Sequence, residues 1–309
     1  LLTSIVQILA PVVLIIAIGW GLLRTGFLSS PALADINRLT YWVGLPALLI
    51  ERISSATPAL GSVGGMLIVL AGTAVASMVL AALIAGLWGM PGRSGVTFIH
   101  GTFRGNLTFV GLPVVIYAFA GSPDAAAVES AALVAFVPMV ILYNVTAVVL
   151  MQLPGGWQPV ATLQRVGRGL LTNPILLSTL VGMTLALLDW ELPLLAERTF
   201  SALGQMALPL ALLGIGGGLY TTRLRGRRQW ALSAAVLKTT AGPLIGALLG
   251  VWVGLSAEEM RLVLIFLACP TAAASFVLVQ QMDGDVALIA STIMLSHLLL
   301  CRRCCWCSR

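Results

Sequence analysis

The chain has 309 residues, of which 59% are apolar and only 9% are charged, and its mean hydropathy is +1.02. A soluble domain carries about 25% charged residues, so this composition excludes a soluble enzyme, a nucleic-acid-binding protein, a disordered chain and a secreted disulfide-rich domain. A polytopic membrane protein remains, with the lipid bilayer as its surroundings. The net charge of +6 is then expected to come from basic residues in cytoplasmic loops, and no nucleic-acid partner is expected.

Ten apolar runs approach the length of about 20 residues that a membrane-spanning helix needs. In chain order they cover 1–23, 39–53, 63–87, 96–119, 125–151, 170–188, 200–219, 230–253, 262–279 and 286–300. The second and tenth are short. We therefore expect an all-α membrane protein with ten transmembrane helices. Because no Met or charged segment precedes the first run, we interpret it as a membrane segment that has been cut back, not as a signal peptide.

The few basic residues predict the orientation. With the N-terminus outside, ten Arg residues fall on the cytoplasmic side and three on the other side, leaving aside the last nine residues of the chain. The ten are Arg24, Arg38, Arg93, Arg104, Arg165, Arg168, Arg223, Arg225, Arg227 and Arg228, and the three are Arg52, Arg198 and Arg261. By the positive-inside rule, both termini of a multi-pass protein of the cell (inner) membrane face the non-cytoplasmic side.

Prolines and glycines indicate an internal repeat. Pro11, Gly19 and Pro46 recur 163 residues later as Pro174, Gly182 and Pro209, and GLPALL at 44–49 resembles ALPLAL at 207–212. Further along, the pattern R-x4-F-x3-P occurs at 104–113 and again, 157 residues later, at 261–270. Since each repeat has five segments, the second must cross the membrane in the opposite sense, as in many secondary transporters.

The repeat divides the chain into a first five-helix repeat at 1–151, a cytoplasmic linker at 152–169, a second, inverted five-helix repeat at 170–300, and an atypical tail at 301–309. The tail, CRRCCWCSR, holds Cys301, Cys304, Cys305 and Cys307. A structural zinc site usually needs two ligand pairs held apart by a fold. We therefore favour a frameshift or a cloning scar over a zinc site, and we expect no metal and no cofactor.

The fourth and ninth segments each contain a predicted break, at Gly111-Leu112-Pro113 and at Cys269-Pro270. Proline removes a backbone N–H and clashes with the preceding turn. One such break is commonly a simple kink, but two at corresponding positions of inverted halves indicate a transporter's substrate site. Each break creates a helix N-terminus with a partial positive charge, which suits an anion such as a carboxylate.

Polar residues beside the breaks complete the predicted substrate site. They are Asn106, Thr108, Thr271 and Ser275, which join Gly111, Pro113, Cys269 and Pro270. The Asn106 amide either donates to a substrate carboxylate or supports packing through a backbone hydrogen bond.

Lys238 is a candidate substrate ligand because it lies about ten residues inside the eighth segment, near the bilayer centre. Its alternative role is that of a snorkelling or carbonyl-bonded lysine. Arg104 and Arg261 are interpreted mainly as snorkelling residues near opposite faces. No catalytic motif is found, so no enzyme is expected.

Several stretches resemble the auxin efflux carrier (AEC) family, in particular its bacterial permeases. They are RGNLTFVGLP at 104–113, NPILL at 173–177, LGQMALPLALLGIGGGL at 203–219, the spacing from Lys238 to Pro243, and CPTAAASFV at 269–277 with the DGD and ASTIMLS that follow. The resemblance implies ten helices with crossing, broken helices 4 and 9. It implies a scaffold of helices 1, 2, 6 and 7, often dimeric, and a moving domain of helices 3–5 and 8–10.

The resemblance implies transport of small organic anions, such as auxin or dicarboxylates, by an elevator-like motion, with Asn106, Pro113 and Pro270 in the crossover motifs. Two alternatives stay open. One is a sodium-coupled symporter of the bile-acid type. The other is a membrane sensor or scaffold that binds ligands without transporting them.

Overall fold

The computed structural model describes residues 2–55, 60–119, 125–155, 163–164, 167–168, 171–221 and 227–306, and within these ranges it is all-α, with no strand. In chain order the elements are α1 (Leu2–Arg24), α2 (Ser30–Leu39), η1 (Thr40–Gly44), α3 (Leu45–Ser54), α4 (Leu60–Leu87), α5 (Gly92–Phe103), η2 (Leu107–Gly111), α6 (Leu112–Phe119), α7 (Ala125–Gln152), η3 (Leu153–Gly155), α9 (Pro174–Leu187), α10 (Leu194–Gln205), α11 (Ala207–Thr221), α12 (Arg228–Val236), η4 (Leu237–Ala241), α13 (Gly242–Val253), α14 (Ala257–Ala268), α15 (Ala274–Gln281) and α16 (Val286–Trp306).

Four stretches of helix within the described residues are long and apolar enough to cross a membrane. They are Val63–Leu87, Ala131–Gln152, Leu194–Thr221 and Arg228–Val253, and shorter apolar helices accompany them. On α4 the exposed side chains include Ile68, Val75, Val79 and Leu83. An apolar exposed face suits lipid contact, so the predicted all-α, multi-pass class is confirmed at this level.

Helix boundaries differ from the predicted runs at several places. The short second run lies in a longer helical stretch, because α2, η1 and α3 follow one another from 30 to 54. The last helix continues six residues past the predicted end at 300, to Trp306. Most of the predicted linker 152–169, together with Asp124, Arg223, Arg225 and Cys307, lies outside the described residues, as do the side chains of the other three tail cysteines.

The chain forms two compact units. Unit 1 comprises 1–63, 108–137 and 170–221, and unit 2 comprises 64–107, 138–169 and 222–309. Unit 1 therefore contains α1, α2, α3, α6, α9, α10 and α11 with the first part of α7, and unit 2 contains α4, α5, α12–α16 and the second part of α7.

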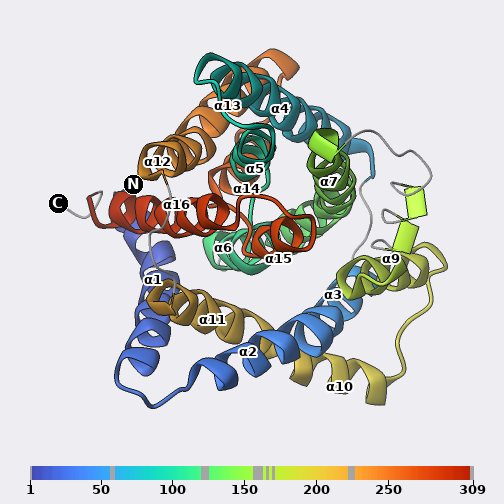
Figure 1. Cartoon of the computed structure of the whole chain (residues 1–309). Helices are drawn as coiled ribbons and strands as arrows, with labels where there is room; N and C mark the ends of the chain where they lie inside the picture. The colour runs from blue at the N-terminus through green and yellow to red at the C-terminus, as the bar shows by residue number, and fades with distance from the viewer. Residues whose placement is uncertain are drawn as a thin grey trace. The chain divides into compact units, whose positions relative to one another are not determined.

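Close helix crossings hold unit 1 together, with α1 beside α11 and α3 beside α9 (Figure 1). A methyl group added at Gly182 of α9 would lie 2.9 Å from the Ile53 Cβ and 3.2 Å from the Leu49 carbonyl oxygen of α3. In the same way, a methyl group at Gly19 of α1 would overlap the backbone of Leu213 on α11. Small residues allow such close backbone contacts, which drive helix association in membranes.

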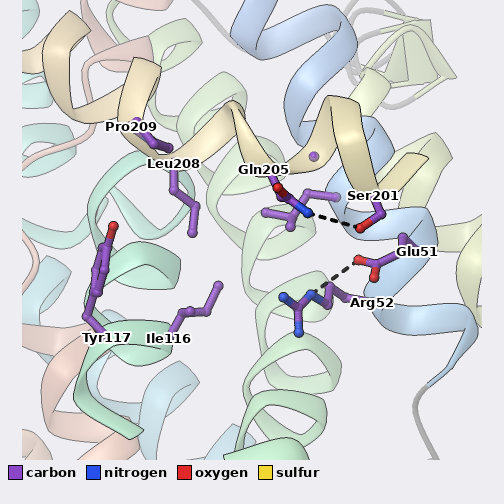
Figure 2. A pocket seen from close by; sticks show the side chains of 10 residues that line it. Glu51, Arg52, Ile116, Tyr117, Ser201, Gln205, Leu208 and Pro209 are labelled. Carbon is purple, nitrogen blue, oxygen red and sulfur yellow. Dashed lines mark hydrogen bonds and ion pairs between the residues drawn. The ribbon is translucent and has the colours of Figure 1, made fainter. Parts of the chain in front are cut away.

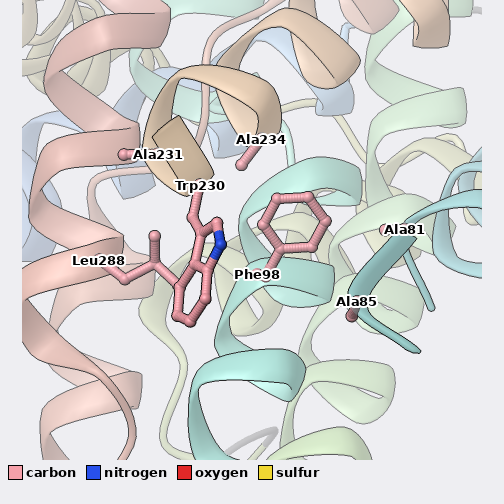
Figure 3. Packing of buried hydrophobic residues seen from close by; sticks show 7 residues of the cluster. All are labelled: Ala81, Ala85, Phe98, Trp230, Ala231, Ala234 and Leu288. Carbon is pink, nitrogen blue, oxygen red and sulfur yellow. The ribbon is translucent and has the colours of Figure 1, made fainter. Parts of the chain in front are cut away.

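In unit 2 an aromatic cluster fixes α5 against its neighbours (Figure 3). Phe98 on α5 and Trp230 on α12 pack with Ala81 and Ala85 of α4 and with Leu288 of α16. Phe98 is fully buried, and Trp230 is 8% exposed. The packing positions α5, which carries half of the candidate site at its C-terminal end.

Three prolines in unbroken helical stretches follow widened, π-helical turns. The turns η1, η2 and η4 each end two residues before a proline, at Pro46, Pro113 and Pro243. In η4 the Gly242 N–H bonds to the Leu237 carbonyl, five residues back. A proline ring clashes with the carbonyl four residues before it, so a wider turn accommodates the ring without breaking the helix.

The first predicted break was therefore placed wrongly. Gly111 and Pro113 lie inside the continuous stretch of η2 and α6, whereas the helix is interrupted earlier, between the end of α5 at Phe103 and the start of η2 at Leu107. The second break was predicted correctly, because α14 ends at Ala268 and α15 begins at Ala274.

The offset of 157 residues was also wrong as an alignment of helices. The half-helices α5 and α14 each have 12 residues, and both their starts and their ends lie 165 residues apart. The R-x4-F-x3-P match does not align these helices, so we attribute it to chance. An offset of 165 is close to the 163 that relates the prolines and glycines of the first segments of each half.

Candidate functional site

The two breaks in unit 2 cross each other as extended backbone. Gly105 and Thr271 form an isolated antiparallel bridge. The Asn106 N–H donates to the Pro270 carbonyl at 2.8 Å, and the Ala272 N–H donates to the Arg104 carbonyl at 3.1 Å. Non-helical backbone inside a membrane protein needs such partners, because lipid offers none. The pairing makes one crossover from segments that are 166 residues apart.

Thr271 connects the crossover to two helices. Its hydroxyl donates to the Gly101 carbonyl near the end of α5 at 2.8 Å, and its N–H donates to the Ser296 hydroxyl of α16 at 3.0 Å. Thr271 is fully buried. The last four carbonyls of a helix lack intrahelical partners, so the Thr271 hydroxyl stabilises the broken end of α5.

Lys238 likewise stabilises the broken end of the other half-helix, α14. Its Nζ donates to the Leu267 carbonyl, one residue before the end of α14, at 2.7 Å. The side chain is 2% exposed, and a methyl group added at Gly105 would lie 3.4 Å from Nζ. The ammonium group therefore lies at the crossover and bonds to a backbone carbonyl, which is the carbonyl-bonded role predicted from the sequence as the alternative.

Two helix starts leave the crossover, at Leu107 for η2 and at Ala274 for α15. Ser275 occupies the second position of α15, is fully buried, and its hydroxyl has no hydrogen-bond partner among the described residues. Asn106 directly precedes η2 and is 2% exposed. A buried hydroxyl at a helix N-terminus is a suitable donor to an anion.

Cys269 directly follows the last residue of α14 and is a buried free thiol. Its Sγ donates to the Ile265 carbonyl of the same helix at 3.2 Å. This contact gives Cys269 a local role at the helix end, and its predicted place in a substrate site rests on position alone.

Arg104 was predicted to snorkel near a membrane face, and the structure corrects this. It follows the last residue of α5, in extended backbone at the crossover, and its Nη2 donates to the Asn144 side-chain oxygen of α7 at 2.8 Å. Twelve residues of helix put this position about 18 Å from the start of α5, near half the hydrocarbon thickness.

The structure brings together Asn106, Lys238, Cys269, Pro270, Thr271 and Ser275 in unit 2. The other predicted site residues, Thr108, Gly111 and Pro113, fall in unit 1 on η2 and α6. The sequence did not single out Ser296, which contacts Thr271, although its polar side chain in an apolar segment was a usable signal. Asn144 of α7 is a second such polar residue in an apolar segment, and its bond to Arg104 links elements 40 residues apart.

Unit 1 contains a separate cavity of about 180 Å³, lined by residues of α3, α6, α10 and α11 (Figure 2). On its polar side Glu51 pairs with Arg52 at 3.2 Å, and Gln205 contacts Ser201 at 3.4 Å. Both side chains of the ion pair are partly exposed. Ligand pockets commonly measure about 300–1,000 Å³, so this cavity lies below the usual range.

Among the described residues no group of three or more His, Cys, Asp or Glu side chains is placed to hold a metal ion. Comparison with curated proteins finds no match. Comparison with protein families matches residues 4–302, nearly the whole chain, to the family described as membrane transport protein. The chain therefore belongs to this family of membrane transporters, the auxin efflux carrier family.

Proposed function

We propose that this membrane transporter is a secondary carrier of small organic anions such as carboxylates, and that the crossover in unit 2 holds the anion. The observation that carries the proposal is the pairing of the two broken segments at Gly105 and Thr271. It brings two helix starts, a buried lysine and the buried Ser275 hydroxyl into one region. Discontinuous helices of this kind form the substrate sites of many transporters.

The charge of the region favours an anion. The Lys238 ammonium is buried, and no acidic side chain pairs with it among the described residues. Helix N-termini carry a partial positive charge, so the starts of η2 and α15 add to the same sign. The substrate ligands we propose are Asn106 and Ser275, with Cys269, Pro270 and Thr271 forming the surrounding backbone and Lys238 supplying positive charge. Thr108, Gly111 and Pro113 belong to unit 1, and their place in the site stays a prediction.

Contacts in unit 1 support the proposed inverted repeat of five plus five helices. Under the offset of 163 residues Gly44 corresponds to Ala207, and a methyl group added at Gly44 would lie 3.2 Å from the Ala207 Cβ. A residue contacts its equivalent in the other repeat only where both lie near the two-fold axis that relates the two repeats. The same offset relates Gly19 to Gly182 and α3 to α11. The contact of Gly19 with α11 therefore corresponds to the contact of Gly182 with α3.

The two compact units support an elevator-type motion in which unit 2 carries the substrate. The crossover residues from Arg104 to Leu107 and from Cys269 to Ser275 belong to unit 2. The division departs from the one that the family implies, because residues 108–137 belong to unit 1, where α6 contacts α1. A homodimer through the scaffold helices 1, 2, 6 and 7 of the predicted fold stays a prediction.

Contacts in unit 2 also support the proposed topology in the cell membrane. At the start of α5, Arg93 donates to the Asp283 carbonyl and the Ser94 hydroxyl donates to Asp285 at 2.8 Å. All four residues belong to predicted cytoplasmic loops. On the predicted non-cytoplasmic side, a methyl group added at Gly65 of α4 would lie 3.0 Å from the Leu255 side chain, and both positions are predicted to be non-cytoplasmic.

The test is flux into proteoliposomes that contain the full chain. Labelled mono- and dicarboxylates should accumulate, whereas labelled cations and neutral solutes of similar size should not. Replacing sodium by potassium should leave the flux unchanged, and a flux that stops would favour the bile-acid-type symporter. Binding of carboxylates without any flux would favour a sensor, and flux of cations alone would contradict the anion site.

Asn106→Ala provides the residue-level test, with Asn173→Ala as its matched control. A hydrogen bond to a charged group contributes about 1.5–3 kcal/mol, so Asn106→Ala should lower the affinity for the anion about tenfold or more. Asn173 caps α9 by accepting from the Ile175 and Leu176 N–H groups. Its replacement should lower the melting temperature and leave the affinity unchanged. Equal affinities in the wild type and Asn106→Ala would assign Asn106 to structure.

A further inference from the structure

The C-terminal end of α14 presents backbone carbonyls to the crossover. The helix stops at Ala268, because Cys269 and Pro270 leave the helical conformation. Carbonyls at a helix end have no intrahelical partners, and together they carry a partial negative charge. In transporters such ends coordinate Na⁺ or protons. The end of α14 is therefore chemically suited to a monovalent cation.

The Lys238 ammonium group occupies this place. Its bond of 2.7 Å to the Leu267 carbonyl has the length of a charge-assisted hydrogen bond. Lysine does not approach the carbonyl from the surface, since its side chain is 2% exposed. It comes from the widened turn η4, in which Lys238 is the second residue.

The neighbouring groups leave the carbonyl as the main counterpart of this charge. No acidic side chain pairs with Lys238 among the described residues, and the Gly101 carbonyl at the end of α5 is already bonded to the Thr271 hydroxyl. Removing the partner of a buried charge is strongly unfavourable. In reverse, removing the lysine leaves the buried Leu267 carbonyl without its donor, which is also costly.

We propose that the end of α14 is a monovalent-cation site whose resident cation is the ammonium group of Lys238, and that Lys238→Ala converts it into a site for a free monovalent cation such as Na⁺ or a primary alkylammonium ion. The wild-type protein then needs no free cation at the crossover. This inference goes beyond the proposed transport of anions and does not depend on which solute is carried.

The test measures the melting temperature of the purified full chain by tryptophan fluorescence, in choline, sodium or n-propylammonium chloride at equal ionic strength. Lys238→Ala keeps Cβ and lacks three carbons and the nitrogen, which n-propylammonium supplies. We expect Lys238→Ala to melt below the wild type in choline chloride. We expect n-propylammonium, and to a smaller extent sodium, to raise its melting temperature by several degrees while leaving the wild type unchanged.

Thr239→Ala is the matched control, because it shortens the neighbouring buried side chain of η4 without removing a charge. It should gain nothing from either cation. If n-propanol raises the melting temperature of Lys238→Ala as much as n-propylammonium does, filling the space suffices and the proposal fails. If neither compound raises it, the proposal is also overturned.

A measurement on the wild type keeps the proposal falsifiable even if Lys238→Ala does not fold. Sodium and choline chloride should give equal wild-type melting temperatures. A stabilisation of several degrees by sodium alone would mean that a free cation binds beside the lysine. Because these readouts involve no flux, they succeed or fail independently of the proposed transport of anions.

Discussion

At the scale of single residues, Thr271 joins three parts of unit 2. Its backbone bridges with Gly105, its N–H bonds to Ser296 of α16, and its hydroxyl bonds to the Gly101 carbonyl of α5. All of these groups are buried away from water. Substitution by valine removes the hydroxyl but keeps the shape of the side chain, so it tests the bond to the Gly101 carbonyl.

We expect Thr271→Val to destabilise the protein by about 1–3 kcal/mol, because it leaves the buried Gly101 carbonyl without this donor. Thermal unfolding in detergent measures the loss. Thr271→Ser keeps the hydroxyl and should recover most of it. Thr292→Val is the matched control, since among the described residues the Thr292 hydroxyl bonds to the Leu288 carbonyl of its own helix. Equal melting temperatures for both valine variants would contradict the role of Thr271.

Ser275 leads to the opposite prediction. Because its buried hydroxyl has no hydrogen-bond partner among the described residues, Ser275→Ala removes no intramolecular bond and should leave the melting temperature of the empty protein unchanged or slightly higher. If the hydroxyl donates to the carried anion, the affinity should fall about tenfold. Isothermal titration calorimetry and flux assays measure the affinity. Unchanged affinity would exclude Ser275 from the site, and a large loss of stability would reveal a structural partner.

At the scale of the helical elements, the widened turn η4 determines where Lys238 lies. Pro243 follows this turn by two residues and cannot donate a hydrogen bond. In Pro243→Ala a regular helix becomes accessible, with the new N–H bonding four residues back. We expect the residues of η4 to rotate and Lys238 to leave the Leu267 carbonyl, and we expect the affinity for the anion to fall about tenfold or more.

Pro46→Ala is the control for this prediction, because η1 has the same turn and the same proline spacing but carries no charged side chain. Its flux and affinity should change much less than those of Pro243→Ala. Equal losses in the two variants would mean that proline removal disturbs the helices in general, and that the placement of Lys238 is not the cause.

How far the sequence predicts these elements depends on whether the cause is local. Apolar runs predicted the ends of α4 and α7 to within three residues, because membrane helices need a continuous apolar stretch. The break after Cys269 followed from Pro270. The break at Gly105 was missed because its cause is the pairing with Thr271, a contact across 166 residues that no local pattern displays.

The same distinction applies to the candidate site. The depth of Lys238 was visible in the sequence, since charges are rare in an apolar segment. Its partner, the Leu267 carbonyl, belongs to the backbone of another helix and has no sequence signature. The break expected at Pro113 failed because η2 widens to admit the ring, and a widened turn and a break have the same proline signature.

At the scale of the whole molecule, the sparse charges make the orientation testable. The predicted topology places Ser30 and Gln229 on the cytoplasmic side and Glu191 and Glu258 on the other, and all four residues are exposed.

In a variant whose five native cysteines are replaced by serine or alanine, a single cysteine at each position should react differently with a membrane-impermeant maleimide. In intact cells we expect labelling of Glu191→Cys and Glu258→Cys only, and after permeabilisation we expect labelling of all four. Ser30 lies in the first half of the repeat and the other three positions lie in the second half, so a reversed labelling of Ser30→Cys alone would contradict the inverted repeat. Reversal of all four would contradict the positive-inside assignment and leave the repeat intact.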